Sequence, residues 1–541
     1  MANGRPALVA IALCVLLAGC TKVGTGSGGG EHAYTHPHEL RFAAAEDLVS
    51  LNPLINSQGT LQYLSAMTMA FLLRSDQNNN PAVPELALAV PSKANGGISA
   101  DGETITYHLR KGVTWSDGAP FNADDVVFTT KLILDPHTNV VTRDGFDQIA
   151  RIEEPDKYTV VYHLKAPYGP FAEVYFASYS GYAILPKHIL AGHDVNTAPY
   201  NSLPVGIGPF KYQEWKRGDS VVLVANSKYF RGLPKLQRVV YKEIQDRNTV
   251  LEELRTHELD LWTPVAPHFI HDVRSIPGVK VLLTPSFYFD HLDFNTQHPG
   301  VNDPVVRRAL RMAVDRGTLN QKVRFGVYAL NESVVPLASR YHVNLPAPFD
   351  IAAADKLLDA DGWKRGPDGI RVKSGVHLSL NFATSTGTPD SDTEIELMRG
   401  WWKQLGVDIQ VRHYLSSLFF ALASQGGIIY GGKFDLVIFA WSGTPFQDLG
   451  NLYSCDRFPP DGQNDLRYCN AAVTAAIRRA KTQYEVTERA PELALIQRQI
   501  DADAPTIVLD DRKEIYAYND DLHGFDPAPV APFDNMMNVD I

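Results

Sequence analysis

A run of polar and aromatic side chains follows an apolar segment late in the chain, between residues 434 and 455. The segment FDLVIFA reads as a strand, and a loop rich in glycine and proline comes directly after it. Such a loop suits the binding of a polar solute, which needs a hydrogen-bond partner for each buried group and some aromatic surface. The loop residues that we expect to face a solute are Trp441, Ser442, Thr444, Phe446, Gln447 and Asp448.

A second polar loop, LNPLINSQGT at residues 51–60, adds Ser57, Gln58 and Thr60 as predicted ligand contacts. For both loops a structural role is the alternative. Ser57 and Thr60 could cap a local turn, and Trp441 could be a packed core aromatic, since tryptophan is mostly buried.

Catalytic motifs do not support an enzyme. The sequence has no G-x-S-x-G elbow, no H-E-x-x-H pair and no Walker loop, and GTGSGG at residues 24–29 follows no strand. The acid pairs at 124–125 and 510–511 are more often helix caps or solvated faces than catalytic dyads. We therefore expect no enzymatic activity and no cofactor, with a secreted hydrolase as the less favoured alternative.

Histidine and cysteine placement gives two further expectations. His32, His36 and His38 could bind a transition metal, but Pro37 favours an extended connector, and we predict no metal site. Cys455 and Cys469 are expected to form a disulfide in an exported protein, whereas two metal-binding thiols would lack a supporting pair of ligands nearby.

The N-terminus has the features of an export signal. Arg5 precedes an apolar run over residues 7–18 that is too short to span a bilayer as a mature helix. The run ends in LAGC, which resembles the lipobox of bacterial lipoproteins and implies a lipid on Cys20; an ordinary signal peptide with an incidental cysteine is the alternative. Residues 1–20 are thus a predicted signal peptide, and residues 21–39 a predicted flexible tether.

Composition fits a large soluble body. The chain has 541 residues, and about 150 residues per domain predicts three to four structural units. A hydrophobic content of 45% and a charged content of 21% are ordinary for globular proteins. The net charge of −11, without a basic run, argues against a nucleic-acid partner.

Regular elements that could position the loops are readable along the chain. At residues 101–134, Ile105 and Tyr107 alternate with polar residues as in a half-buried strand, and Asn122 can cap a helix that begins with Asp124 and Asp125. Residues 61–73 are expected to form a helix. Further strands are expected at 160–164 and 221–224, and further helices at 250–254 and 305–313.

Several of these segments together carry a resemblance to a known family. They read DGETITYHLRKGVTWSDGAPFNADDVVF from residue 101, VGIGPFKYQEWKRGDSVVLVANSKYF from 205, HLDFNTQHPGVNDPVVRRAL from 291 and WWKQLGVDIQV from 401. In this order they resemble the extracellular solute-binding proteins of the dipeptide, oligopeptide and nickel group, which serve ABC importers.

The resemblance implies two α/β lobes of the periplasmic-binding-protein type (class II, large), with a subdomain inserted in the first lobe. Lobe I is expected at 40–85, 203–292 and 505–541, the inserted subdomain at 86–202 and lobe II at 293–504. It further implies a monomer, anchored outside the cytoplasm by its lipid, that captures a small solute by lobe closure and delivers it to permease subunits of an ABC importer.

Two positions depart from the family's dipeptide-binding pattern. Thr444 stands where relatives commonly carry an Asp that meets the ligand ammonium, and Ser385 where they commonly carry an Arg that meets the ligand carboxylate. Asp448 could replace the first of these charges. Because uncompensated ions are costly in a closed site, we expect a longer oligopeptide bound through its backbone. The alternatives are a sugar, a metal chelate, or a sensing role without an importer.

Overall fold

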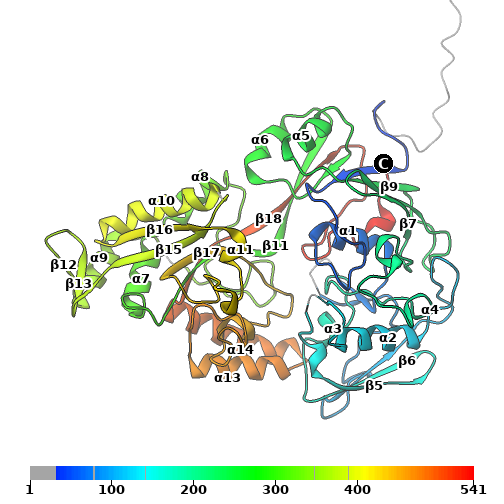
Figure 1. Cartoon of the computed structure of the whole chain (residues 1–541), viewed down its shortest axis with the longest axis horizontal. Helices are drawn as coiled ribbons and strands as arrows, with labels where there is room; N and C mark the ends of the chain where they lie inside the picture. The colour runs from blue at the N-terminus through cyan, green and yellow to red at the C-terminus, as the bar shows by residue number, and fades with distance from the viewer. Residues whose placement is uncertain (1–31, 77–79, 141, 347, 388) are drawn as a thin grey trace, which may run out of the picture.

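The computed structural model describes residues 32–76, 80–140, 142–346, 348–387 and 389–541. Within these residues the chain forms two α/β lobes that share one mixed sheet (Figure 1). Across the sheet the strands are, in spatial order, β16 (Asp408–Tyr414), β15 (Ser379–Ser385), β17 (Leu436–Ser442), β11 (Val279–Phe294), β18 (Thr506–Asn519), β10 (Leu261–Trp262), β1 (Glu39–Ala43), β9 (Arg238–Lys242), β8 (Ser220–Ala225) and β7 (Phe210–Lys216). The two-lobed architecture implied by the resemblance is confirmed.

Strands β11 and β18 are antiparallel to each other and pass from one lobe to the other. The first half of β11 and the second half of β18 lie in lobe I, where β18 pairs with β10. The second half of β11 and the first half of β18 lie in lobe II, where β11 pairs with β17. A register irregularity between Pro285 and Phe289 separates the two halves. Bulges bend strands and increase their twist, so this point is where the shared sheet changes direction.

Lobe I is built around β1, β9 and β10, which pair in parallel, with β7 and β8 added as a hairpin. Its core joins strand residues such as Leu40, Phe42 and Tyr241 to Leu61 and Leu64 of the first helix. The helices of this lobe are α1 (Gly59–Thr68), α5 (Arg247–Arg255) and α6 (Ile270–Arg274), with short 3₁₀ turns at Pro267–Phe269 and Met536–Asn538.

The inserted subdomain has its own antiparallel sheet in the order β4–β6–β5 and its own aromatic core. Ile105 and Tyr107 of β4 are fully buried, as their alternation predicts. The expected cap of α2 is present as a capping box, in which Asn122 accepts from Asp124 N–H and Asp125 accepts from Asn122 N–H. Its elements are β4 (Thr104–His108), α2 (Ala123–Leu134), β5 (Ile149–Asp156), β6 (Thr159–Leu164), α3 (Phe171–Val174) and α4 (Lys187–Leu190), with 3₁₀ turns at Phe146–Gln148 and Pro199–Ser202.

In lobe II, helices cover both faces of the sheet. Leu436 and Ile438 of β17 pack with the core of α7, α9 and α10, whereas Trp441 points to the opposite face and packs with α13 and α14. The elements are α7 (Pro304–Met312), α8 (Arg316–Val323), α9 (Ile351–Ala360), β12 (Lys364–Arg365), β13 (Arg371–Lys373), β14 (Val376–His377), α10 (Pro389–Gln404), α11 (Ser416–Phe419), a 3₁₀ turn at Ala423–Gln425, α12 (Gly450–Tyr453), α13 (Ala471–Thr482) and α14 (Val486–Asp503).

The helix expected over residues 61–73 is shorter than predicted. It ends at Thr68, and Leu73 belongs instead to β2 (Leu73–Arg74), which pairs with β3 (Val83–Pro84). Residues 69–73 are all buried, so their apolar run contains no periodicity that could distinguish a strand from a helix.

The chain ends are fastened together on lobe I. His32 forms an ion pair with Asp520 at 2.7 Å, and His38 contacts Asp540 at 2.8 Å. His36 lies near Glu39 instead. The three histidines therefore contact separate carboxylates, so His32, His36 and His38 of the predicted tether lie against folded parts of the protein.

The predicted signal peptide, Cys20 and the tether up to residue 31 lie outside the described residues. In the part of the chain that the structure describes, no helix is both long enough and apolar enough to cross a membrane.

Candidate ligand-binding cleft

Three adjoining cavities lie between the inserted subdomain, lobe I and lobe II. Their volumes are about 510, 410 and 190 Å³, and Thr142 lines all three. The two larger ones also share Asp144, Ser442, Thr444 and Asp448, so they form one cleft. Its size lies within the range of small-molecule sites, about 300–1,000 Å³.

The end of β17 forms the lobe II wall of this cleft. Trp441 is half-buried beside Phe289 of β11 and lines the largest cavity. Ser442 and Thr444 are exposed and line both larger cavities. A strand that ends at the lobe edge thus presents an indole and two hydroxyls to the cleft, which is the arrangement expected from the sequence.

Phe446 lines the 410 Å³ cavity and is held from both sides. Its ring stacks on the guanidinium of Arg489 at 3.8 Å, and its backbone N–H donates to the Glu173 carboxylate of the inserted subdomain at 2.7 Å. The Phe446 backbone therefore connects lobe II with the inserted subdomain.

Asp448 lines both larger cavities, but its carboxylate already has partners. One oxygen accepts from Gly450 N–H at 2.9 Å, and the other pairs with Lys481 of α13 at 2.8 Å. The neighbouring Gln447, in a left-handed conformation with φ 60°, donates to the carbonyl of Thr444 and so fixes the loop. Asp448 is therefore a poor substitute for the missing carboxylate at position 444, because Lys481 neutralises it.

Only one of the three residues predicted from the first loop reaches a cavity. Ser57 lines the 190 Å³ cavity. Gln58 turns the other way and bonds to the backbone of residues 47 and 49, and Thr60 is buried within the first turn of α1. Gln62 and Ser65, one turn further along α1, line the small cavity instead.

The inserted subdomain supplies cleft residues that the sequence analysis did not predict. Asp144, Tyr168, Glu173 and Tyr182 all line the 410 Å³ cavity. Asp144 is exposed to the cleft, yet the surrounding protein desolvates its carboxyl and raises its pKa, and the nearby Asp448 acts in the same direction. No short motif marks these positions in the sequence.

Burial also raises the pKa of Glu173, to about 7. Desolvation is the largest cause, and it outweighs the Phe446 N–H bond and the positive charge of Arg489, which act in the opposite direction. The carboxyl that connects the inserted subdomain with lobe II therefore titrates near neutral pH.

A second contact between these two parts surrounds Tyr484, between α13 and α14; Figure 1 shows both helices beside α3. The Tyr484 hydroxyl donates to Gly102 O at 2.6 Å and accepts from Tyr168 N–H at 3.0 Å. Gly169 N–H donates to Lys481 O at 2.9 Å. The structure thus shows the lobes in mutual contact around the cleft.

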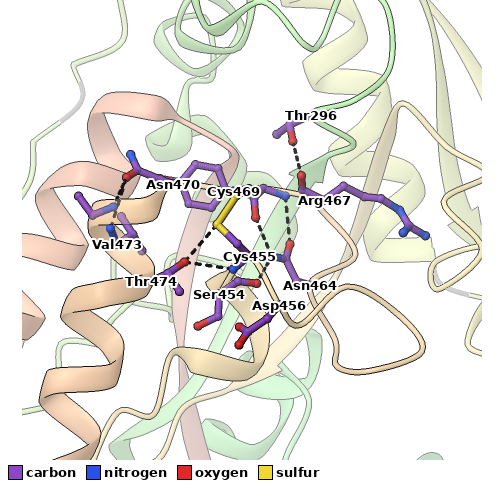
Figure 2. Close-up of a disulfide and its surroundings, with 12 residues drawn as sticks. Thr296, Ser454, Cys455, Asp456, Asn464, Arg467, Cys469, Asn470, Val473 and Thr474 are labelled. Atoms are coloured by element: carbon purple, nitrogen blue, oxygen red, sulfur yellow. Dashed lines mark hydrogen bonds between the residues drawn. A yellow bond between two sulfur atoms is a disulfide. The ribbon is translucent and has the colours of Figure 1, made fainter.

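Cys455 and Cys469 form a disulfide (Figure 2). Thr474 of α13 accepts from Cys455 N–H at 3.1 Å, and the buried Asn464 donates to the carbonyls of Ser454 and Tyr468. The intervening loop is therefore fixed to α13 and to itself. Its residues Asp456 and Arg457 line the largest cavity.

One group of possible metal ligands occurs within the described residues. His32, Asp520 and Asp521 bring three ligand atoms within 4.8 Å of one another. They lie at the joined chain ends and do not line the three cavities, and His32 already bonds to both carboxylates. The arrangement is explained as a fastening of the N-terminus.

Comparison with known proteins decides the family. The model of the bacterial extracellular solute-binding proteins, family 5, matches residues 82–459. The chain belongs to this family. It is therefore a solute-binding protein of an extracellular family and not an enzyme.

This family 5 protein is similar over nearly its whole length to several members. It is 26% identical to the oligopeptide-binding protein AppA of Bacillus subtilis, covering 98% of this chain and 96% of the relative. It is 24% identical to a dipeptide-binding protein of Pseudomonas aeruginosa, covering 91% and 93%.

Solved structures share the fold. The AppA complex with a nonapeptide superposes with a TM-score of 0.74 at 24% identity, covering 93% of this chain and 98% of that one. NikZ of Campylobacter jejuni in complex with Ni(L-His) gives 0.75 at 23% identity, covering 93% and 99%.

The two departures from the family pattern have different surroundings in this solute-binding protein. Thr444 lines both larger cavities, so a neutral hydroxyl faces the cleft there. Ser385 is buried at the end of β15 and is not among the residues that line the three cavities described above. Neither position therefore supplies a charge to the three cavities.

Proposed function

We propose that this protein captures a peptide in the cleft between its lobes and delivers it to the permease subunits of an ABC importer. The observation that carries the proposal is the cleft itself, where Trp441, Phe446 and Tyr168 supply aromatic surface among hydroxyl and carboxylate groups. Backbone amides of a peptide need this mixture of apolar area and hydrogen-bond partners. The peptide-binding names of the relatives support the same solute class.

Lobe closure provides the means of capture. A solute that touches Ser442 on lobe II and Tyr168 on the inserted subdomain stabilises the state in which the two lie together. The irregular pairing of β11 and β18 lies beside this cleft, because Phe287 and Tyr288 of the irregular segment line the 410 Å³ cavity. Bending at this point opens and closes the cleft.

We further propose that Cys20 carries a lipid and holds the protein, as a monomer, at the outer face of the cell membrane. The support is the LAGC sequence together with an extracellular family. Cys20→Ser should release the protein from the membrane fraction, measured by fractionation and by incorporation of labelled fatty acid. A Cys20→Ser protein that stays in the membrane fraction and still takes up label would contradict the anchor.

Identification of the bound solute tests the peptide proposal. The full chain is purified from its native membrane in mild detergent, denatured, and the released small molecules are identified by mass spectrometry. Peptides are the expected result. A sugar or a metal chelate would overturn the peptide assignment. Uptake of labelled peptide that is unchanged in cells lacking the protein would favour a sensing role over import.

A further inference from the structure

Six charged side chains line the largest cavity, and four of them neutralise one another. Asp448 pairs with Lys481 at 2.8 Å, and Asp456 pairs with Arg478 at 2.9 Å. The two that remain are Asp144 and Arg457. These two form no ion pair with a described residue, and the charge of Lys481, which already pairs with Asp448, lies within electrostatic range of Asp144.

The Asp144 carboxylate faces the cleft from the inserted subdomain. It makes no hydrogen bond or ion pair with any residue that the structure describes; the backbone N–H of Asp144 bonds to the Thr142 hydroxyl. The pKa of this carboxyl is raised mainly by desolvation. A cation placed beside it would relieve that cost.

The Arg457 guanidinium enters the cavity from lobe II. Within the described residues, the guanidinium of Arg457 makes one hydrogen bond, a long one of 3.3 Å to the backbone carbonyl of Asp461. The backbone of Arg457 is held by Ser454 O at 3.1 Å and by Asn464 N–H at 2.9 Å, two residues after the disulfide cysteine. The side chain therefore starts from a fixed position and has free donors for a carboxylate.

The charges of Asp144 and Arg457 interact electrostatically without direct contact. Lys481 lowers the pKa of Asp144 most among the neighbouring charges, and Arg457 lowers it to a smaller extent; neither side chain forms an ion pair with Asp144 in the described residues. The charges thus lie within electrostatic range, and the space between them is the cavity of about 510 Å³.

We propose that Asp144 binds the ammonium group and Arg457 the carboxylate of a zwitterionic solute, a short peptide with both termini free. The inference rests on the proposed function and refines it. The two ionic contacts come from the inserted subdomain and from lobe II, so a solute that satisfies both connects the two bodies. They replace the charges that are absent at Thr444 and Ser385.

Size favours a peptide of two or three residues. An extended chain advances about 3.3–3.6 Å per residue, so the termini of a nonapeptide lie about 30 Å apart and do not fit one cavity of this volume. Side chains of a short peptide can enter the adjoining 410 Å³ cavity, which shares Asp144. The inference therefore differs from the sequence-based preference for a longer peptide.

The test compares free and blocked termini on the full chain. Tripeptide libraries with free ends, with acetylated amino ends and with amidated carboxyl ends are equilibrated with the protein, and bound peptide is quantified by mass spectrometry. We expect blocking either end to weaken binding about ten-fold or more. Asp144→Asn should remove the preference for a free amino end only, and Arg457→Gln the preference for a free carboxyl end only.

Matched controls remove the same charges nearby. Asp147→Asn changes an acid three residues from Asp144 that does not line the cavity, and Arg479→Gln changes an arginine of α13 that pairs with Glu492 and does not line the cavity. Both should keep the two terminal preferences. Loss of either preference in these variants would show that general charge, not the two named contacts, is responsible.

A nine-residue library separates the two levels of the proposal. Equal binding of free and blocked tripeptides, or binding of nine-residue peptides only, overturns the assignment of Asp144 and Arg457 while the peptide-binding function stands. If no peptide of either length binds, the proposed function fails and this inference fails with it.

Discussion

Gly169 lies where the inserted subdomain packs tightly against lobe II, and an alanine there should hold the cleft open. A Cβ atom at this position would lie 2.3 Å from the carbonyl oxygen of Gln483 and 2.9 Å from the Phe446 ring. Ordinary contact needs about 1 Å more, so the two bodies must separate. Gly169 has no positive φ, and alanine is therefore tolerated by the local backbone.

The magnitude follows from the hydrogen bonds at this contact. Separation breaks the bond from Gly169 N–H to Lys481 O and strains the two bonds of the Tyr484 hydroxyl. At about 1 kcal/mol net for each bond, closure loses about 2 kcal/mol, which corresponds to roughly 30-fold. Because the solute binds between the bodies, its affinity should fall by a similar factor.

Calorimetry of peptide binding and solution scattering together test this reasoning. Gly169→Ala should bind peptide about 30-fold more weakly and show a larger radius of gyration with peptide present. Gly400→Ala is the matched control, because a Cβ there meets no atom within 4 Å and the residue lies in α10, where alanine is favoured. Unchanged affinity and an unchanged radius in Gly169→Ala would refute a role of this contact in closure.

Three further predictions concern stability. The folded-state pKa of Glu173 is raised to about 7 from an ordinary 4.5, so protonated Glu173 contributes about 3 kcal/mol to the free energy of unfolding below about pH 4.5, and this contribution is lost as pH rises through 7. Glu173→Gln should reduce this loss of stability, measured by denaturant unfolding at pH 5 and pH 8. Equal pH dependence in the two proteins would contradict the prediction. Replacing Cys455 and Cys469 by serine opens a loop with a sequence separation of 14 and should cost about 3 kcal/mol in the same assay, whereas an unchanged midpoint would show that the loop needs no covalent link. Arg324 is buried and lies 2.6 Å from the Glu394 carboxylate. Arg324→Met should lower the free energy of unfolding by about 3–5 kcal/mol, because a buried carboxylate loses its partner. A smaller loss would mean that the Glu394 carboxyl is neutral.

The fold was predictable wherever neighbours in the sequence decide the structure. The alternation at Ile105 and Tyr107 and the cap at Asn122 depend on spacing over a few residues, and both are present. The conformation of residues 69–73 could not be predicted from the sequence, because it depends on the pairing of Leu73 with Pro84. All five residues are buried, so their hydrophobic pattern shows neither a helical nor a strand period. The domain boundaries drawn from the resemblance stay predictions.

The cleft was only partly predictable. The strand-to-loop rule brings Trp441, Ser442 and Thr444 to the cavities, because a sheet edge exposes the residues that follow a strand. The same reasoning could not tell that Gln58 faces its own loop. Asp144 lies about 300 positions before Ser442 and Asp448 in the sequence and meets them only after folding, so no local pattern marks it.

Both chain ends are bound to lobe I, and this limits how the protein can be placed at a membrane surface. His38 N–H bonds to the carbonyl of the last residue, Ile541, and His32 contacts Asp520. If Cys20 carries the lipid, the twelve residues to His32 reach at most about 40 Å, so lobe I stays close to the bilayer. With such an anchor, closure would move lobe II relative to a lobe I that is held within this distance of the bilayer.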